Sequence, residues 1–294
     1  MLRRLTIPCA ILVLGAASAL AQEPVPASAP KAAPVPAAKP ALADFFAAAR
    51  ADAAGVVPLI LEASAQLPTL DPAHSKQVGD ALEPFLARAF FGSERLPGME
   101  RLGLVLHKVE KGENPTKIGE RYRIGAKMLA YLNDGFDEKK MRIGSELKVL
   151  DLSKASVEVD VAKGMYRLAL WRTLPEGKHA LVLFAPVGLR AAESPTPIGR
   201  TTVVKRVLDP PWTDPSTNQT YLPSDPRNVL GGYWIALDAA GLGQSGIGLH
   251  GFTGAPESDW IAKPASHGCV RMLQRDIDRV FQLALEGTPV AIID

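Results

Sequence analysis

The sequence offers little support for a membrane-embedded protein. Its one apolar run near the N-terminus, from Leu5 to Ala19, is shorter than the about 20 residues that a stable membrane span needs, and no later run approaches that length. Two arginines precede the run, and Ala19-Leu20-Ala21 provides the small residues that signal peptidase recognises. Residues 1–21 are therefore predicted to be a cleaved signal peptide. The mature protein is expected to be exported without an integral membrane segment.

The chain also has little net charge and few cysteines. The chain has 33 Lys and Arg against 31 Asp and Glu, so loss of the two arginines of the signal peptide leaves 31 against 31. Nucleic acid is therefore not an expected partner, because binding it requires an excess of positive charge. Cys269 would be the only cysteine of the mature protein, so it cannot form an internal disulfide. It is either a small buried apolar residue or a reactive thiol.

The first half of the mature chain is predicted to contain a linker and a helical region. Residues 22–41 are almost wholly Ala and Pro, which is typical of an extended linker. Residues 42–98 show helical spacing of apolar residues. Their clearest helix begins at Asp71, a capping residue, with Pro72 at the first helical position. Pro84 is expected to kink this helix. No chemistry is indicated in this region.

Residues 104–151 predict a small unit of a strand, two helices and a second strand. Asn114 is expected to cap the first helix, which Pro115 opens. This βααβ order resembles a LysM module, a family that binds the glycan of peptidoglycan or chitin. The family usually has Gly-Asp-Thr after its first strand, where this sequence has Gly112-Glu113-Asn114. The resemblance implies glycan strands as a partner, and a small α+β domain without a ligand is the alternative.

From residue 157 to residue 294 the pattern favours strands, which indicates a β-rich sandwich or barrel. Alternating or continuous apolar residues predict strands at 157–161, 166–170, 181–187, 201–207, 234–237 and 290–293. One helix is predicted at residues 274–286. A proline-rich loop from Leu208 to Leu230 is interpreted as a flap over a binding cleft, with an inert insertion as the alternative.

Chemistry is concentrated in one segment, His250-Gly251 followed after a spacer by Ser266-His267-Gly268-Cys269-Val270-Arg271. A thiol is mostly protonated at neutral pH and needs a base or a cation nearby to act as a nucleophile. His267 precedes Cys269 by two residues, and on a strand two such side chains share a face. Gly268 would let backbone amides approach an oxyanion, and Arg271 offers a planar fork for a carboxylate.

This segment resembles the catalytic signature of the YkuD-type L,D-transpeptidases, which is a histidine, a spacer of this size and then Ser/Thr-His-Gly-Cys. Further family segments are matched by Thr196-Pro197-Ile198-Gly199, Asn228-Val229-Leu230-Gly231 and Gly287-Thr288-Pro289-Val290, with Val229 in place of the usual proline. The family often has asparagine where Arg271 stands. The resemblance spans residues 157–294. It implies a multidomain protein, with a β-rich catalytic domain that has one C-terminal helix, a LysM-like α+β domain and a helical N-terminal region.

The resemblance implies cysteine-dependent acyl transfer without a metal or an organic cofactor. The implied catalytic residues are Cys269 as nucleophile, His267 as base and Ser266 as the group that orients the imidazole, with His250, Gly268 and Arg271 around the substrate and the oxyanion. The thiolate would attack a peptidoglycan stem peptide and release its terminal D-amino acid. An amine of another stem, or of a protein, would then resolve the thioester. The expected location is the periplasm or the cell wall.

Three alternatives stay open. Water can replace the acceptor amine, which would give an L,D-carboxypeptidase or a wall-remodelling hydrolase with the same residues. A non-catalytic LysM protein that binds peptidoglycan is the second. In the third, His250, His267 and Cys269 bind zinc, and Glu257 or Asp259 provides the fourth ligand. His74, His107 and His179 stand apart from this segment and are interpreted as surface or packing residues.

Overall fold

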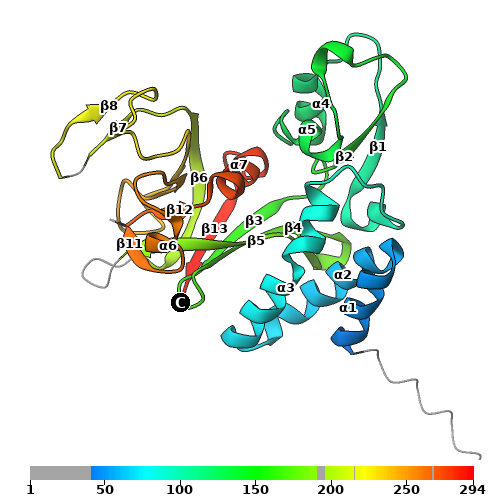
Figure 1. Cartoon of the computed structure of the whole chain (residues 1–294), viewed down its shortest axis with the longest axis horizontal. Helices are drawn as coiled ribbons and strands as arrows, with labels where there is room; N and C mark the ends of the chain where they lie inside the picture. The colour runs from blue at the N-terminus through cyan, green and yellow to red at the C-terminus, as the bar shows by residue number, and fades with distance from the viewer. Residues whose placement is uncertain (1–40, 191–195, 215, 267) are drawn as a thin grey trace, which may run out of the picture. The chain divides into compact units, whose positions relative to one another are not determined.

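The computed structural model describes residues 41–190, 196–214, 216–266 and 268–294 (Figure 1). The predicted signal peptide and all but the last residue of the predicted linker therefore lie outside the described residues. Residues 40–294 form one compact unit. Within its described part, no helix is both long enough and apolar enough to cross a membrane.

Three helices form the N-terminal helical region, which confirms that prediction. They are α1 (Leu42–Ala51), α2 (Val56–Gln66) and α3 (Pro72–Phe90), joined by the short 3₁₀ turns η1 (Ala53–Gly55) and η2 (Leu67–Thr69). The predicted cap is present, since Asp71 Oδ1 accepts the backbone N–H groups of Ala73 and His74. The helix α3 continues through Pro84 to its end.

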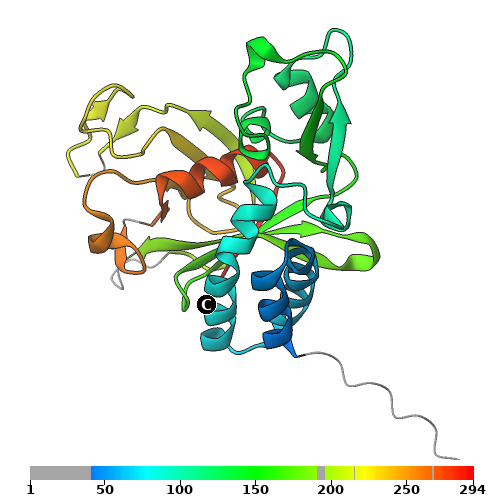
Figure 2. The same cartoon turned by 45° about the vertical axis from the view of Figure 1, so that its right-hand side comes forward.

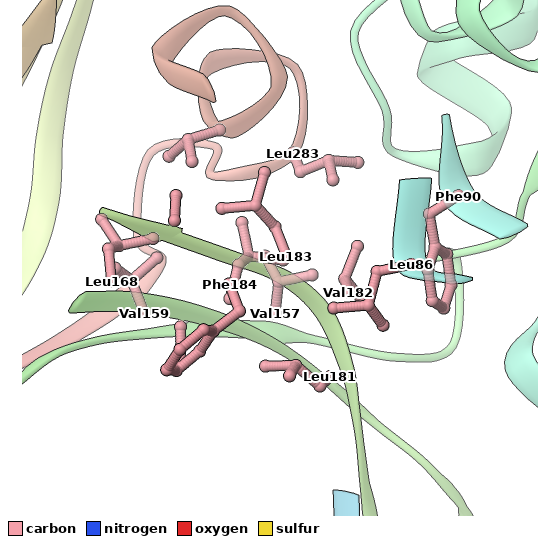
Figure 3. Close-up of a cluster of buried hydrophobic side chains, with 14 of the residues drawn as sticks. Leu86, Phe90, Val157, Val159, Leu168, Leu181, Val182, Leu183, Phe184 and Leu283 are labelled. Atoms are coloured by element: carbon pink, nitrogen blue, oxygen red, sulfur yellow. The ribbon is translucent and has the colours of Figure 1, made fainter. Parts of the chain in front are cut away.

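This helical region packs against the strand-rich part of the chain. Helices α2 and α3 contact β5 (His179–Arg190). Gly79 of α3 approaches the Phe184 ring so closely that a Cβ atom would lie 2.5 Å from it. Figure 3 shows Leu86 of α3 in the same apolar cluster as strand residues and Leu283. The helices are therefore part of a shared hydrophobic core.

The predicted strand-helix-helix-strand order is present in the next segment. After η3 (Met99–Leu102) come β1 (Leu104–Lys108), α4 (Pro115–Tyr122), α5 (Met128–Leu132), η4 (Glu138–Lys140) and β2 (Glu146–Leu150). The strands β1 and β2 pair antiparallel. Asn114 caps α4 as predicted, with its Oδ1 accepting the Lys117 N–H at 2.8 Å. A small apolar cluster of its own lies inside this segment.

Two sets of polar contacts join this segment to its neighbours. The Lys148 side chain is almost fully buried, and its Nζ donates to the carbonyl oxygens of Ala89, Gly92 and Glu94 at 2.7–2.8 Å. Burial lowers the pKa of Lys148 to about 8. On another side, the Asp278 carboxylate pairs with Lys127 and accepts the Tyr131 hydroxyl.

The strand-rich part forms a nine-stranded sheet, which confirms the predicted β-rich fold. Its remaining strands are β3 (Val157–Ala162), β4 (Arg167–Thr173), β6 (Gly199–Leu208), β9 (Tyr233–Leu237), β10 (Gly248–Gly251), β11 (Pro264–Ser266), β12 (Val270–Met272) and β13 (Pro289–Ile293). They lie in the order β11-β5-β12-β10-β9-β6-β13-β3-β4, and β4 also pairs with β5, so the sheet closes into a barrel. The helix α7 (Gln274–Leu283), orange to red in Figure 2, packs against β9 and β10.

Three local features differ from the predictions. Helix α7 ends at Leu283 instead of residue 286, because Ala284 leaves the helical conformation at ψ 84°. A one-turn helix, α6 (Glu257–Trp260), accompanies it in this part of the chain, where a single helix was expected. The proline-rich loop contains a small hairpin of β7 (Trp212–Thr213) and β8 (Thr220–Tyr221), here called the flap hairpin.

Candidate active site

A row of side chains crosses four neighbouring strands of the sheet. Arg271 of β12 pairs in register with His250 of β10, which pairs with Trp234 of β9, which pairs with Val207 of β6. All four residues line a cleft of about 550 Å³ that also contains Cys269. The pairing of these strands therefore brings together residues that lie far apart in the sequence.

The flap hairpin contributes to the lining of this cleft. Pro210, Pro211, Trp212 and Thr213 all line it, so the proline-rich loop borders the cleft as predicted. The Trp212 ring stacks on Tyr221 of the facing strand, with their centroids 5.6 Å apart. The guanidinium of Arg227 lies 4.6 Å from the centroid of the same Tyr221 ring. This stack gives the hairpin a defined aromatic surface.

Cys269 lies in a turn, and the prediction that it lies on a strand is wrong. β11 ends at Ser266 and β12 begins at Val270, because Gly268 adopts a φ of +132° that turns the chain between them. The Gly268 N–H donates to Ser266 Oγ at 3.3 Å, and the Ser266 hydroxyl donates to the Cys269 carbonyl oxygen at 2.7 Å. Ser266 thus holds the turn in shape. His267 lies outside the described residues.

The sulfur of Cys269 is partly exposed in the cleft. Its Sγ lies 3.4 Å from the carbonyl oxygen of Gly246, a residue from the loop before β10. Arg271 follows two residues later, and the negative charge of a Cys269 thiolate would stabilise the charged form of its guanidinium. The same interaction stabilises the thiolate, since a nearby cation favours the ionised form of a thiol.

Arg271 is held in place by an aromatic ring. Its guanidinium carbon lies 3.7 Å from the centroid of the Phe252 ring, a close cation–π contact. Burial lowers the pKa of Arg271, although arginine stays charged at any physiological pH. The result is a fixed positive charge beside the cysteine.

His250 is buried and electrically neutral. Its Nδ1 lies 2.5 Å from the carbonyl oxygen of Gly251, so Nδ1 carries the proton and Nε2 is left as an acceptor. The imidazole stacks on Trp234, with the ring centroids 5.7 Å apart. Burial, helped by the charge of Arg271, lowers the pKa of His250 to about 4. At neutral pH it therefore adds no charge to the cleft.

The charges of the cleft are all of one sign. Lys205 of β6 and Arg271 of β12 line it, whereas no aspartate or glutamate is among the lining residues that the structure describes. Low-dielectric walls around two cations attract an anionic substrate. The described residues contain no group of three His, Cys, Asp or Glu side chains placed to hold a metal ion.

Comparison with known proteins identifies the fold that carries this cleft. Residues 154–292 match the model of the YkuD family, described as the L,D-transpeptidase catalytic domain. Residues 154–292 form a YkuD-type L,D-transpeptidase catalytic domain. The match begins three residues before the expected range of 157–294 and ends two residues before its end, and it includes Cys269, His250 and His267.

Curated relatives of this transpeptidase domain carry the same description. The probable L,D-transpeptidase YcfS of Escherichia coli is 27% identical over 209 residues, which cover 64% of this chain and 61% of that protein. The putative L,D-transpeptidase YqjB of Bacillus subtilis is 41% identical over 69 residues, which cover 24% of this chain and 38% of that protein. The chain thus spans less than two thirds of the length of either relative.

Solved structures of L,D-transpeptidases are also among the proteins that match this chain. A mutant L,D-transpeptidase of Enterococcus faecium has a TM-score of 0.36 at 20% identity and covers 47% of this chain and 50% of its own. L,D-transpeptidase 3 of Mycobacterium tuberculosis has a TM-score of 0.35 at 14% identity and covers 65% of this chain and 92% of its own.

The structure brings together most of the residues predicted for the transpeptidase site. His250, Ser266, Cys269 and Arg271 line the cleft, and Gly268 lies in the turn beside it. Glu257 lies on α6 and is not part of the lining. Lys205 and Trp234 were not identified from the sequence. Their positions depend on the pairing of β6 with β9, for which no local pattern gives a signal.

The three other histidines are not among the residues that line this cleft. His107 is buried in the βααβ segment, between the Tyr122 hydroxyl at 3.0 Å and the Glu113 carboxylate at 2.7 Å. His74 is an exposed partner of the capping residue Asp71. Packing and surface roles therefore account for these two, as predicted, and His179 is an exposed residue of β5.

Proposed function

We propose that this protein is an exported peptidoglycan L,D-transpeptidase that uses Cys269 as its nucleophile. The observation that carries the proposal is the position of Cys269, which is partly exposed in a cationic cleft of a transpeptidase domain. Stem peptides end in a carboxylate, so a cleft lined by cations and by no described acidic residue suits them.

The reaction takes place in two steps. In the first, the thiolate of Cys269 attacks the carbonyl carbon of the L-centre that precedes the terminal D-amino acid. The C–N bond breaks, the amine leaves with a proton from His267, and a thioester remains. In the second, an acceptor amine attacks the thioester carbon and gives a proton to His267. The C–S bond then breaks and returns the thiolate. The acceptor amine belongs to another stem peptide or to a protein. In the hydrolytic alternative, water attacks in its place.

The other residues of the cleft position the reacting groups. We assign Ser266 to the turn that carries Cys269, because its hydroxyl is bonded to the backbone there. Its carbonyl oxygen stays the predicted partner of the His267 imidazole. His250 is neutral and presents Nε2 as an acceptor, so it is proposed to accept a hydrogen bond from a substrate N–H. The oxyanion is assigned to the backbone amides around Gly268 and to the charge of Arg271.

The test is a reaction of the purified protein with tetrapeptide muropeptides, followed by mass analysis of the products. Release of the terminal D-amino acid together with a cross-linked dimer supports a transpeptidase. Release without a dimer or another amine adduct indicates a carboxypeptidase. Cys269→Ala is the matched control. If the wild-type protein releases no D-amino acid from any tetrapeptide, the proposed reaction is wrong.

We further propose that residues 104–151 bind the glycan strands, as a LysM-like module. The βααβ order supports this role, and two apolar side chains, Leu106 and Ile143, are exposed on the segment at 42% and 69%. Binding of the polymer would raise the local concentration of stem peptides at the cleft. Ile143→Ser and Leu106→Ser should each reduce sedimentation with purified sacculi while activity on soluble muropeptides is kept. Unchanged sedimentation of the double variant would leave the segment a spacer.

A further inference from the structure

Lys205 is a positive charge in the cleft that the reaction proposed above does not use. It lies on β6, is exposed, and lines the same cleft as Cys269. No described aspartate or glutamate is among the residues that line the cleft with it. Its charge is therefore available to a bound molecule.

The two cations of the cleft lie on different strands, with Arg271 at one end of the row across the sheet and Lys205 two residues before Val207, which is at the other end. Arg271 and Val207 are separated by three steps between neighbouring strands. At about 4.8 Å per step this is about 14 Å across the strands. Lys205 is two residues before Val207, about 7 Å further along the strand, so its Cα lies about 16 Å from that of Arg271 measured in the sheet. Because both side chains are long, their charges can approach each other more closely than the Cα atoms do.

The surface between these two charges is neutral. It consists of the His250 imidazole, which burial keeps uncharged, and of the Trp234 ring stacked on it. Val207 and Trp212 add apolar surface beside Lys205. A peptide laid across the strands would meet a cation near the reacting bond, then a flat neutral stretch, and then a second cation.

We propose that Lys205 determines specificity by binding a carboxylate on the acyl portion of the donor peptide. Carboxylates are the anionic groups of a peptide, and the terminal one leaves with the D-amino acid at the Cys269 end. The ammonium of Lys205 therefore selects donors that carry a second, free carboxylate over donors in which it is a carboxamide. This inference rests on the proposed function, since it names the class of donor.

The experiment combines two donors with four proteins. The donors are a pair of tetrapeptides that differ only in whether the second carboxyl group is free or amidated. The proteins are the wild type, Lys205→Met, Lys205→Arg and the control Lys178→Met, which removes an exposed lysine outside the cleft. The rate of D-amino acid release gives kcat and KM for each pair.

Lys205→Met should raise KM for the free-acid donor about fivefold with a smaller change in kcat, the size expected for an exposed ion pair. Amidation of the donor should raise KM of the wild type by a similar factor, and the two changes together should add nothing further. Lys205→Arg should restore most of the difference, and Lys178→Met should behave as the wild type. High salt should reduce the discrimination.

The outcomes separate this inference from the proposed function. If the wild type releases no D-amino acid from either donor, the proposed reaction fails and the inference with it. If it turns both donors over with the same KM, or if Lys205→Met raises KM equally for both, the reaction stands and the role of Lys205 is wrong.

Discussion

The sulfur of Cys269 lies beside one fixed cation in a cleft whose described lining contains no carboxylate. Arg271 keeps its charge at every physiological pH. His250, the nearest described imidazole of the motif, is neutral and cannot stabilise the thiolate by charge. In the proposed mechanism, reactivity of the thiol therefore depends on Arg271 and on His267, which precedes Cys269 by two residues in the sequence.

Alkylation of Cys269 tests this dependence. Reaction of the wild type with iodoacetamide should persist well below pH 8, because an imidazolium and a guanidinium both favour the thiolate. His267→Gln should slow the reaction at neutral pH and leave it to recover as the thiol ionises unaided. Cys269→Ala should take up no label and should lose D-amino acid release by several orders of magnitude. Identical pH profiles for the wild type and His267→Gln would refute the proposed pair.

The buried imidazole of His250 predicts a pH dependence of stability. Its folded-state pKa of about 4 lies below its ordinary value of 6.5, so the unfolded chain binds more protons between these pH values. The free energy of unfolding should therefore fall as the pH drops from about 6.5 to about 4, by up to about 3 kcal/mol. It should change little through this group above pH 7.

Urea unfolding at several pH values measures this effect. His250→Gln removes the titrating group at similar size, so its stability should depend less on pH over the same range. His74→Gln, which changes an exposed histidine, is the matched control and should keep the wild-type slope. A slope that is the same in all three proteins would mean that His250 is accessible to protons in the folded state.

At the scale of elements, the end of α3 depends on a side chain from β2. The last carbonyl groups of a helix lack partners within it. Here the Lys148 ammonium, which belongs to β2, donates hydrogen bonds to three carbonyl oxygens at and beyond the end of α3. These hydrogen bonds join the βααβ segment to the helical region through a side chain.

Lys148→Met should therefore destabilise the protein, although it keeps the length and apolar stem of the side chain. One buried and two partly buried carbonyl groups lose their donor, which we expect to cost about 2 kcal/mol of unfolding free energy. Lys139→Met, at an exposed lysine of η4, is the control and should change the unfolding free energy by less than about 0.5 kcal/mol. Equal stability of the two variants would show that water replaces the ammonium at this helix end.

Sequence reasoning succeeded for elements in which the signal is local. The caps at Asp71 and Asn114 follow from side chains that bond to the next turn of the chain. It failed at Cys269, where strand periodicity was extended across Gly268, although that glycine turns the backbone. The burial of Lys148 and the approach of Lys205 to the cleft depend on contacts between distant segments. Nothing in their local sequence distinguishes them from the other lysines of the chain.

At the scale of the whole molecule, one hydrophobic cluster contains side chains from all three parts of the unit. Leu59 and Leu86 come from the helical region, Leu104 and Leu150 from the βααβ segment, and the strands of the sheet provide most of the others. The separate cluster inside the βααβ segment is small. Each part therefore depends on the others for burial of its apolar surface.

A single cooperative unfolding transition is expected for residues 41–294. Calorimetry of the wild type should give equal calorimetric and van't Hoff enthalpies. A protein that lacks residues 104–151 should be unfolded or strongly destabilised, because the shared core would be opened. Asp278→Asn, which weakens the contact with Lys127 and Tyr131, should lower the one transition without splitting it. Two resolved transitions in the wild type would show that the parts fold independently.

The place of β13 in the barrel has a consequence for the time at which the barrel can form. β13 lies between β6 and β3, and its residues 290–293 pair in parallel with residues 159–162, the first strand of the sheet. During synthesis, β3 is made well over a hundred residues before its neighbour exists. The barrel therefore stays incomplete until its last strand has been translated, and pairings between such distant segments form slowly. A chain in this state remains open while it is being made, which would suit the export that residues 1–21 predict.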